Sequence, residues 1–320
     1  MKILMTGATG LVGTALTQSL VADGHTVVRL SRGGPHPKPG PTTVGVTDVT
    51  WDAKAATNAA LGFTDDTARS QVESMDAAVN LAGAPVAGGR WTAKRKEVLR
   101  SSRIETTRAL LVMMRGLNAP PRVWLSASAI GIYGNRGDEV LTEESASGSD
   151  FLSNLAAQWE SEARKAESSG VRVVLARFGI ILARQGGALP PMMRPFQLFV
   201  GGRMGSGQQW ISWVTLEDVV GILRLALANP AVSGPINVVS PQPVRNIDFA
   251  KELGRAMHRP AVFPAPAFGL RLALGADMAN QMLLSSQRVE PRNLKRVGYS
   301  FRHTDLPSAL SAVLAAPWPL

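Results

Sequence analysis

Short apolar runs alternate with amphipathic stretches through the first half of the chain, and this pattern predicts alternating strands and helices. Strands are expected at residues 3–5, 26–30, 77–82, 122–126 and 171–178. Helices are expected at residues 11–21, from about residue 92, and at residues 151–168. Strands separated by helices pair in parallel, with the helices covering both faces of the sheet. The pattern therefore predicts an α/β fold with a doubly wound parallel sheet.

The pattern changes near Gly179, where glycine and proline interrupt it and aromatic residues gather. We expect residues 1–184 to form the sheet domain, with residues 214–240 returning to it through a strand at 235–239. Residues 185–213 and 241–320, ending in an amphipathic helix near 306–314, are expected to form a smaller cap. In such folds ligands bind at the carboxyl edge of the sheet, which this cap would cover.

A glycine-rich turn joins the first predicted strand to the first predicted helix. Glycines at this spacing let the chain turn off a strand, approach a pyrophosphate closely and begin a helix whose amides face the anion. The turn predicts a dinucleotide site. Its candidate cofactor-binding residues are Thr6, Gly7, Thr9, Gly10, Leu11, Val12 and Gly13.

The end of the second predicted strand bears on which dinucleotide is bound. Proteins that bind NAD usually place an acid there to accept the ribose 2′-hydroxyl. Here the chain has Ser31 and Arg32 instead. A guanidinium suits a 2′-phosphate, so NADP is favoured over NAD and NADPH over NADH. The alternative is that Arg32 is a solvated side chain at a strand end.

Composition excludes some classes of function. The 320 residues include 45% hydrophobic residues, no cysteine and a formal charge of +10, with a pI near 10.6. The densest basic group falls in one predicted helix without interleaved aromatics, so we expect no nucleic-acid partner. None of the four histidines has metal-ligand spacing, so no metal site is expected. No apolar run is long enough to cross a bilayer, and we expect a cytoplasmic protein without membrane association.

Six segments carry a resemblance to a known family: residues 6–13, 80–83, 90–92, 126–134, 207–213 and 243–246. They resemble the atypical extended short-chain dehydrogenase/reductases, or NAD-dependent epimerase/dehydratase-like proteins, some of which are labelled cell-division inhibitors. The resemblance implies an NADP-binding Rossmann domain, a C-terminal substrate domain and a small carbonyl or sugar-like substrate. It also implies the possibility of a homodimer.

The resemblance places further cofactor-binding residues at the ends of the next two strands. Leu81, Ala82 and Gly83 follow the strand that ends at Asn80, where small residues let the backbone pass close to the cofactor ribose. Ser126 ends the predicted strand that follows. The alternative for Gly83 is a simple turn glycine.

The chain lacks the tyrosine and lysine, four residues apart, that transfer a proton in active members of the wider family. Its two tyrosines are Tyr133 and Tyr299, followed four residues later by glycine and histidine. Aligning the helix on Glu160 puts Leu152 and Ala156 in the positions of the pair. Neither side chain can transfer a proton.

Three polar residues remain as candidates for catalysis, each with an alternative. Ser128, at a strand end, would bind a substrate oxygen or form a turn. Arg103 would reach the cleft, as a partial replacement for the missing cation and a cofactor contact, or lie on the surface. Tyr133 would act in acid–base chemistry, contact substrate or pack internally. Arg177, at the next strand end, would hold an anionic substrate group or form an ion pair.

Two hypotheses of function follow. The first is an NADP-dependent oxidoreductase or epimerase-like enzyme acting under the cap. The second is a sensor or scaffold that keeps the fold and the cofactor but has lost the chemistry. The missing tyrosine and lysine favour the second, and the Trp-lined, Gly-rich cap favours the first.

Overall fold

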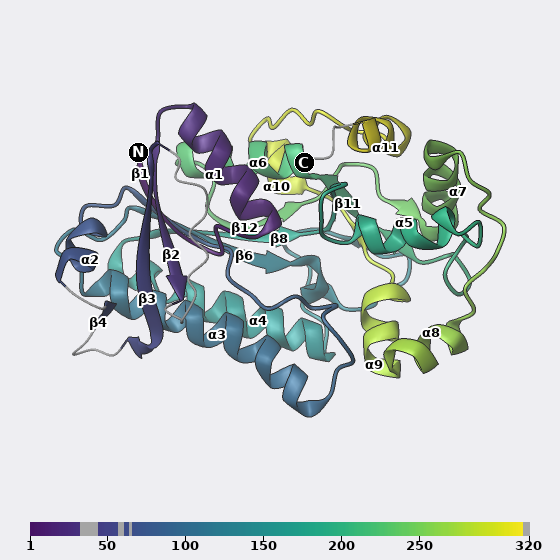
Figure 1. Cartoon of the computed structure of the whole chain (residues 1–320), viewed down its shortest axis with the longest axis horizontal. Helices are drawn as coiled ribbons and strands as arrows, with labels where there is room; N and C mark the ends of the chain where they lie inside the picture. Colours follow the sequence, from purple (N-terminus) through teal and green to yellow (C-terminus); the bar gives the residue numbers. More distant parts are fainter. Residues whose placement is uncertain (33–43, 57–60, 64–65, 316–320) are drawn as a thin grey trace.

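The computed structural model describes residues 1–32, 44–56, 61–63 and 66–315, and the side chain of Arg32 lies outside this description. Within it the main sheet has the strand order β12-β8-β6-β5-β1-β2-β3-β4 (Figure 1). Its strands are β1 (Lys2–Thr6), β2 (Thr26–Arg32), β3 (Val46–Ala56), β4 (Leu61–Phe63), β5 (Ala77–Asn80), β6 (Val123–Ala129), β8 (Arg172–Phe178) and β12 (Gly234–Val238). All neighbours pair in parallel except β3 and β4. The predicted doubly wound parallel sheet is confirmed.

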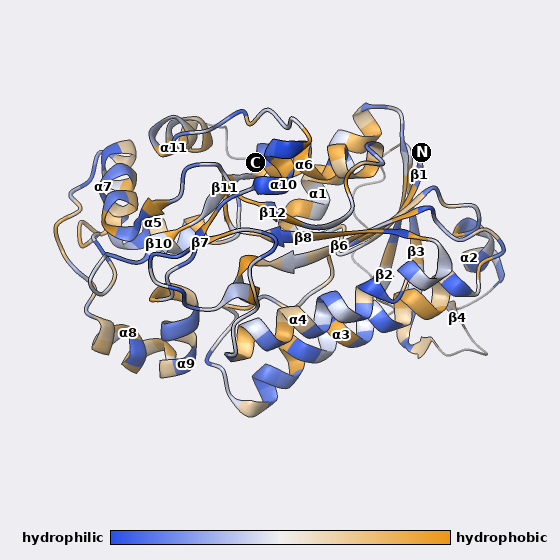
Figure 2. Cartoon of the chain, turned by 180° about the vertical axis from the view of Figure 1, so that it is seen from behind, coloured by the Kyte–Doolittle hydropathy of each residue, from blue (hydrophilic) through white to orange (hydrophobic). Residues whose placement is uncertain are grey.

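Helices cover both faces of this sheet because alternate strand residues point to opposite faces. Ile3 and Met5 pack on the face covered by α1 (Leu11–Ala22) and α6 (Leu216–Ala228). Leu4 packs on the other face, against α2 (Asp66–Gln71), α3 (Ala93–Arg115) and α4 (Phe151–Arg164). Figure 2 shows the mixed hydropathy of α3 and α4 beside the apolar strands. Burial on both faces explains the nearly continuous apolar strand sequences.

The remaining elements lie beyond the carboxyl edge of the sheet or return to it (Figure 1). The short strands are β7 (Val140–Leu141), β9 (Ile180–Leu182), β10 (Trp210–Ile211), β11 (Trp213–Thr215), β13 (Val244–Arg245) and β14 (Arg288–Val289). The helices are α5 (Leu189–Gln197), α7 (Asn246–Met257), α8 (Ala267–Leu274), α9 (Ala276–Met278), a π-helical turn (Ala279–Leu283), α10 (Arg292–Arg296) and α11 (Leu306–Ala315). Phe196, Trp213, Phe249 and Leu310 build a separate core here. Leu294 of α10 instead joins the core of the main sheet.

The predicted helix at residues 151–168 ends earlier, at Arg164, and a 3₁₀ turn (Glu167–Ser169) follows. The strands β3 and β4 and the helix α2 were not predicted from the hydrophobic pattern. In β3, Asp48, Asp52 and Lys54 interrupt the apolar residues, and these residue types are uncommon in strands. Pairing with β2 stabilises β3 despite these unfavourable residues.

A chain of buried hydrogen bonds ties the carboxyl ends of β1 and β5 to the helices beneath them. The Thr6 hydroxyl donates to Asn80 Oδ1 at 2.7 Å, and Asn80 Nδ2 donates to Thr107 Oγ1 of α3 at 2.8 Å. The indole Nε1 of Trp159 in α4 donates to the same Thr107 oxygen at 2.9 Å. Asn80 and Thr107 are fully buried. These bonds therefore hold β1, β5, α3 and α4 together at the edge where ligands bind in such folds.

Replacing Thr107 with valine tests this chain of hydrogen bonds. The change keeps the shape of the side chain but leaves two buried donors, on Asn80 and Trp159, without their acceptor. We expect the free energy of unfolding to fall by about 2–4 kcal/mol, measured by urea denaturation. The exposed Thr67 in α2 gives the control, Thr67→Val, which should change it by less than about 0.5 kcal/mol. An equal loss of unfolding free energy in both variants would contradict the proposed importance of these hydrogen bonds.

Candidate functional site

The glycine turn between β1 and α1 depends on close contacts between backbone segments. Gly7 has φ +69°, and a Cβ there would lie 2.5 Å from the carbonyl carbon of Leu81. A Cβ at Gly13 would lie 2.3 Å from the carbonyl oxygen of Gly7. Real Cβ atoms do not approach so closely, so both positions require glycine. The turn is thereby pressed against the segment that follows β5.

The N-terminus of α1 is open to a ligand. Gly10 is its N-cap residue and has no side chain to cap the helix, and the first turn carries no acid. Thr9 and Gly10 are exposed, and a Cβ added at Gly10 would contact only the Gly7 oxygen, at 3.3 Å. Free amides and the helix dipole at such an end attract an anion. The side chain of Leu11 at the start of the same helix packs against Gly186 and Gly187, which follow β9.

The predicted site for the 2′-phosphate lies at the end of β2. Ser31 is half-buried and pairs with Thr50 of β3, and the backbone of Arg32 pairs with Trp51. The side chain of Arg32 lies outside the described part of the structure. Arg29, two residues before Ser31 on β2, is buried and makes a bidentate ion pair with Asp48 at 2.8 and 2.6 Å. That pairing leaves Arg29 unavailable to a ligand.

The segment after β5 meets both the glycine turn and α3. The Leu81 amide donates to the Thr6 carbonyl at 3.1 Å, and the Ala82 amide donates to Asn80 Oδ1 at 3.3 Å. Gly83 is exposed, and the guanidinium of Arg103 lies against it, 3.1 Å from where a Cβ would stand. Arg103 therefore lies inside this edge of the sheet rather than on an outer helix face.

Ser128, at the end of β6, is part of a buried ionic network. Its hydroxyl donates to Glu160 Oε1 at 2.7 Å, and Arg177 of β8 donates to both oxygens of the same carboxylate, at 2.7 and 2.8 Å. Ser128 is 3% exposed. Of the two alternatives for Arg177, the structure shows the ion pair. Ser126, two residues before Ser128 on β6, is fully buried.

Tyr133 belongs to the same network. Its hydroxyl donates to Asn237 Oδ1 at 2.7 Å and accepts from Arg177 Nη1 at 2.9 Å. The side chain is fully buried, and this burial raises its pKa above the ordinary value. Glu143, which was not among the predicted site residues, accepts from the backbone amide of Asn237 at 2.9 Å. No motif in the sequence marks Glu143 as a site residue.

The two positions of the missing proton-transfer pair are filled by apolar side chains. Ala156 is buried, and Leu152 contacts Gly131. The Leu152 amide donates to Gln281 Oε1, in the π-helical turn, at 3.2 Å. No hydroxyl or ammonium group stands at either position.

The segment around α8 and α9 reaches back to the sheet domain. Arg90 donates to the carbonyls of Leu272 and Ala273, and Lys96 pairs with Asp277 at 2.5 Å. With the contact between Gln281 and Leu152, these bonds bring the cap onto the first turns of α3 and α4. Both parts of the chain therefore flank the carboxyl edge of the sheet.

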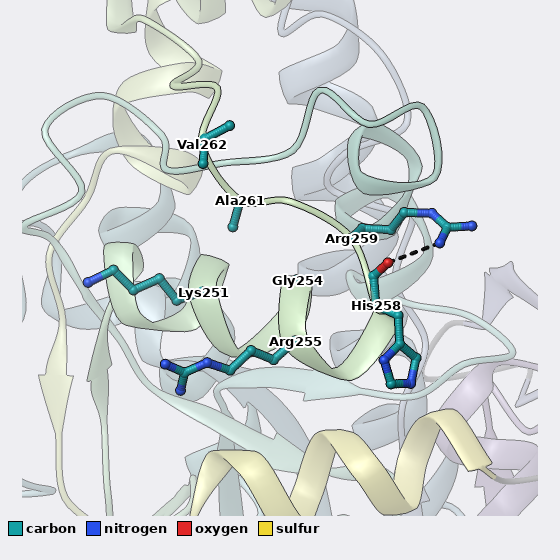
Figure 3. A pocket seen from close by; sticks show the side chains of 7 residues that line it. All are labelled: Lys251, Gly254, Arg255, His258, Arg259, Ala261 and Val262. Carbon is teal, nitrogen blue, oxygen red and sulfur yellow. Dashed lines mark hydrogen bonds between the residues drawn. The ribbon is translucent and has the colours of Figure 1, made fainter.

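A separate basic cavity lies at the end of α7 (Figure 3). Its lining includes Lys251, Arg255, His258 and Arg259. Lys251 and Arg255 pair with acids one turn earlier on the helix, at 4.0 and 2.6 Å. Cations at a helix C-terminus offset its dipole. Arg255, in the last turn of α7, is placed to offset this dipole.

Two kinds of feature are absent from the described residues. No group of three or more His, Asp and Glu side chains is placed to hold a metal ion among them. In the same residues, no helix is both long and apolar enough to span a bilayer.

Comparison with known proteins places this geometry in a family. Residues 3–239 match the model of the NAD dependent epimerase/dehydratase family, and residues 265–313 match a domain of unknown function, DUF1731. Epimerase family protein YfhF of Bacillus subtilis is 38% identical over 316 residues, covering 98% of each chain. Human epimerase family protein SDR39U1 is 37% identical over 318 residues, covering 98% of this chain and all of the human one.

Solved structures agree with this assignment. The crystal structure of human SDR39U1 (isoform 2) with NADPH has a TM-score of 0.86 at 35% identity and covers 99% of this chain and 100% of its own. The UDP-glucose 4-epimerase of Thermus thermophilus, solved with NAD, has a TM-score of 0.75 at 16% identity and covers 98% of each chain, which shows a shared fold. The matches to the family model and to its named relatives span the glycine turn, the main sheet and the cap, and the chain belongs to the NAD-dependent epimerase/dehydratase family.

Proposed function

We propose that this chain binds NADP(H) at the carboxyl edge of its main sheet. The observation that carries the proposal is the glycine turn, in which Gly7 and Gly13 admit no Cβ and Gly10 leaves the N-terminus of α1 uncapped. The pyrophosphate would bind the free amides there. The human relative solved with NADPH, similar over nearly the whole chain, supports the same cofactor.

The rest of the cofactor would follow the sheet edge in both directions from the glycine turn. Ser31 and Arg32 at the end of β2 would bind the 2′-phosphate, which favours NADPH over NADH. Leu81, Ala82, Gly83 and Arg103 would contact the ribose on the nicotinamide side. Ser126 would support this end from inside the sheet.

For the reaction, we propose hydride transfer between the nicotinamide and a small carbonyl or sugar-like substrate beneath the cap. The bound cofactor would supply or accept the hydride. Arg103 would attract the substrate oxygen through its positive charge, because its guanidinium lies against the exposed Gly83. Ser128 and Tyr133 would act from within the network around Arg177, by fixing the end of β6 beneath the reacting group.

One observation favours the second candidate function, a cofactor-binding sensor or scaffold without chemistry. Leu152 and Ala156 replace the proton-transfer pair, and the hydroxyls of Ser128 and Tyr133 are both engaged in buried hydrogen bonds. A protein of this kind would bind NADPH without oxidising it. The two candidates differ in turnover and share the cofactor site.

Gly10→Ala tests the pyrophosphate site. The methyl group fits the protein, with one contact of 3.3 Å and an ordinary φ of −77°, but it stands where the cofactor must approach. We expect the Kd for NADPH, measured by nicotinamide fluorescence, to rise at least about tenfold, with little change in melting temperature. Gly269→Ala in α8, where the Cβ has ordinary space, is the control and should leave the Kd unchanged. Unaltered NADPH binding by Gly10→Ala would overturn the site.

Arg32→Ala tests the preference between the two dinucleotides. If Arg32 binds the 2′-phosphate, its loss should weaken NADPH by about tenfold or more and leave NADH nearly unaffected, since NADH lacks that phosphate. Parallel fluorescence titrations measure both affinities. An equal loss for both cofactors would show that Arg32 does not meet the 2′-phosphate.

Ser128→Ala and Tyr133→Phe test the roles of the buried hydroxyls. Tyr133→Phe removes a hydroxyl bonded to Asn237 and Arg177, and should lower the free energy of unfolding by about 1–2 kcal/mol while leaving the Kd for NADPH unchanged. Under the enzyme hypothesis, Ser128→Ala lowers kcat in a carbonyl-substrate screen. A stable Tyr133→Phe protein that has lost turnover would instead give the phenol a direct catalytic role.

A further inference from the structure

Two arginines of α3 point at the loop that follows β5. Arg103 donates from Nη2 to the Ala84 carbonyl and from Nη1 to the Leu99 carbonyl, both at 3.1 Å. Arg95, two turns earlier, donates from Nη2 to the Pro85 carbonyl. The glycines of this loop make room for them, since a Cβ at Gly88 would lie 2.6 Å from Arg95 Nη2. Both guanidinium groups are thus packed onto residues 83–88.

These two cations are left without a counter-charge by the protein. No carboxylate of the described residues makes an ion pair with either, and Arg103 is flanked instead by the Trp159 ring, at 5.2 Å. The Nε–H of Arg95 is buried and has no hydrogen-bond partner within the described structure. Burial, and then the charge of Arg95, lower the pKa of Arg103 to about 10, so it stays charged at neutral pH.

Three other arginines that are buried or half-buried, Arg29, Arg172 and Arg177, have partners that Arg95 and Arg103 lack. Arg29 pairs with Asp48, and Arg177 pairs with Glu160. Arg172 has no acid but binds three carbonyls at the C-terminal end of α6 and just after it, where the helix dipole is negative. Arg95 and Arg103 lie in the first half of α3 and gain no such compensation. Two neighbouring cations with a buried unsatisfied donor are costly unless an anion joins them.

The arginine pair lies beside the proposed cofactor site. Gly7 touches Leu81, and the guanidinium of Arg103 touches Gly83, two residues further along. We propose that Arg95 and Arg103 bind an oxyanion, a carboxylate or phosphate group, of a ligand in this cleft. The inference rests on the proposed function and adds to it the chemical class of the ligand. A planar guanidinium binds either oxyanion through two parallel hydrogen bonds.

The anion has two possible sources, the substrate and a phosphate of the dinucleotide, and the test separates them. The variants are Arg103→Gln, Arg95→Gln and the double change. Arg100→Gln is the matched control, because Arg100 lies on the same helix but is exposed and bonded to Gln158. The melting temperature is measured in inorganic phosphate and in chloride at equal ionic strength, and the Kd for NADPH by fluorescence.

We expect phosphate to stabilise the wild-type protein and the Arg100→Gln control more than chloride does. The double variant should lose most of that difference, while its melting temperature in chloride stays equal or rises, because an uncompensated charge pair has been removed. A purely structural role would lower the melting temperature in chloride and leave the phosphate effect intact. That result, or an absence of any phosphate effect on the wild-type protein, would overturn the proposal.

The NADPH titration assigns the source. An unchanged Kd in the double variant points to an anionic substrate, and a Kd raised tenfold or more points to a phosphate of the dinucleotide; each supports the oxyanion site. A wild-type protein that shows the phosphate effect but binds no NADPH would overturn the proposed function while leaving the arginine site standing.

Discussion

Direct contact between two stretches of backbone governs the arrangement of the carboxyl edge in this protein. Gly7 lies so close to Leu81 that a Cβ would fall 2.5 Å from its carbonyl carbon, and Gly13 lies as close to Gly7 itself. The hydrogen bonds from Thr6 through Asn80 to Thr107 link the same two strand ends to α3. Because these contacts fix both the start of α1 and the loop after β5, they also set where any ligand anion can bind.

The arginines at this edge are paired differently in two parts of it. Around β6 and β8, Arg177 is neutralised by Glu160, and Ser128 and Tyr133 are drawn into the same buried network. Around the loop after β5, Arg95 and Arg103 have only carbonyls and a ring beside them. The polar groups in the first part are bonded to one another, whereas the two arginines in the second have no carboxylate partner among the described residues. This protein, which lacks the tyrosine and lysine of its wider family, thus carries two neighbouring arginines beside the loop after β5.

Local sequence was sufficient to predict the elements on which the edge is built. The glycine turn, the strand at β1 and the helix α1 follow from three glycines after an apolar run, and the sheet follows from the alternation of apolar segments. The partners of the candidate residues could not be predicted in this way. Glu160 lies 32 residues from Ser128, and Asn237 lies 104 residues from Tyr133, so only the fold brings them together. The strand β3 was missed because its polar residues oppose strand formation locally and its pairing partner β2 decides the outcome.

We propose that the open N-terminus of α1 holds the pyrophosphate of NADP(H). Its most direct test is an equilibrium titration of the unaltered protein with NADPH and, in parallel, with NADH, followed by nicotinamide fluorescence. We expect saturable binding of NADPH with an affinity at least about tenfold above that of NADH. Absence of binding by both dinucleotides would contradict it and would leave the glycine turn as a structural feature alone.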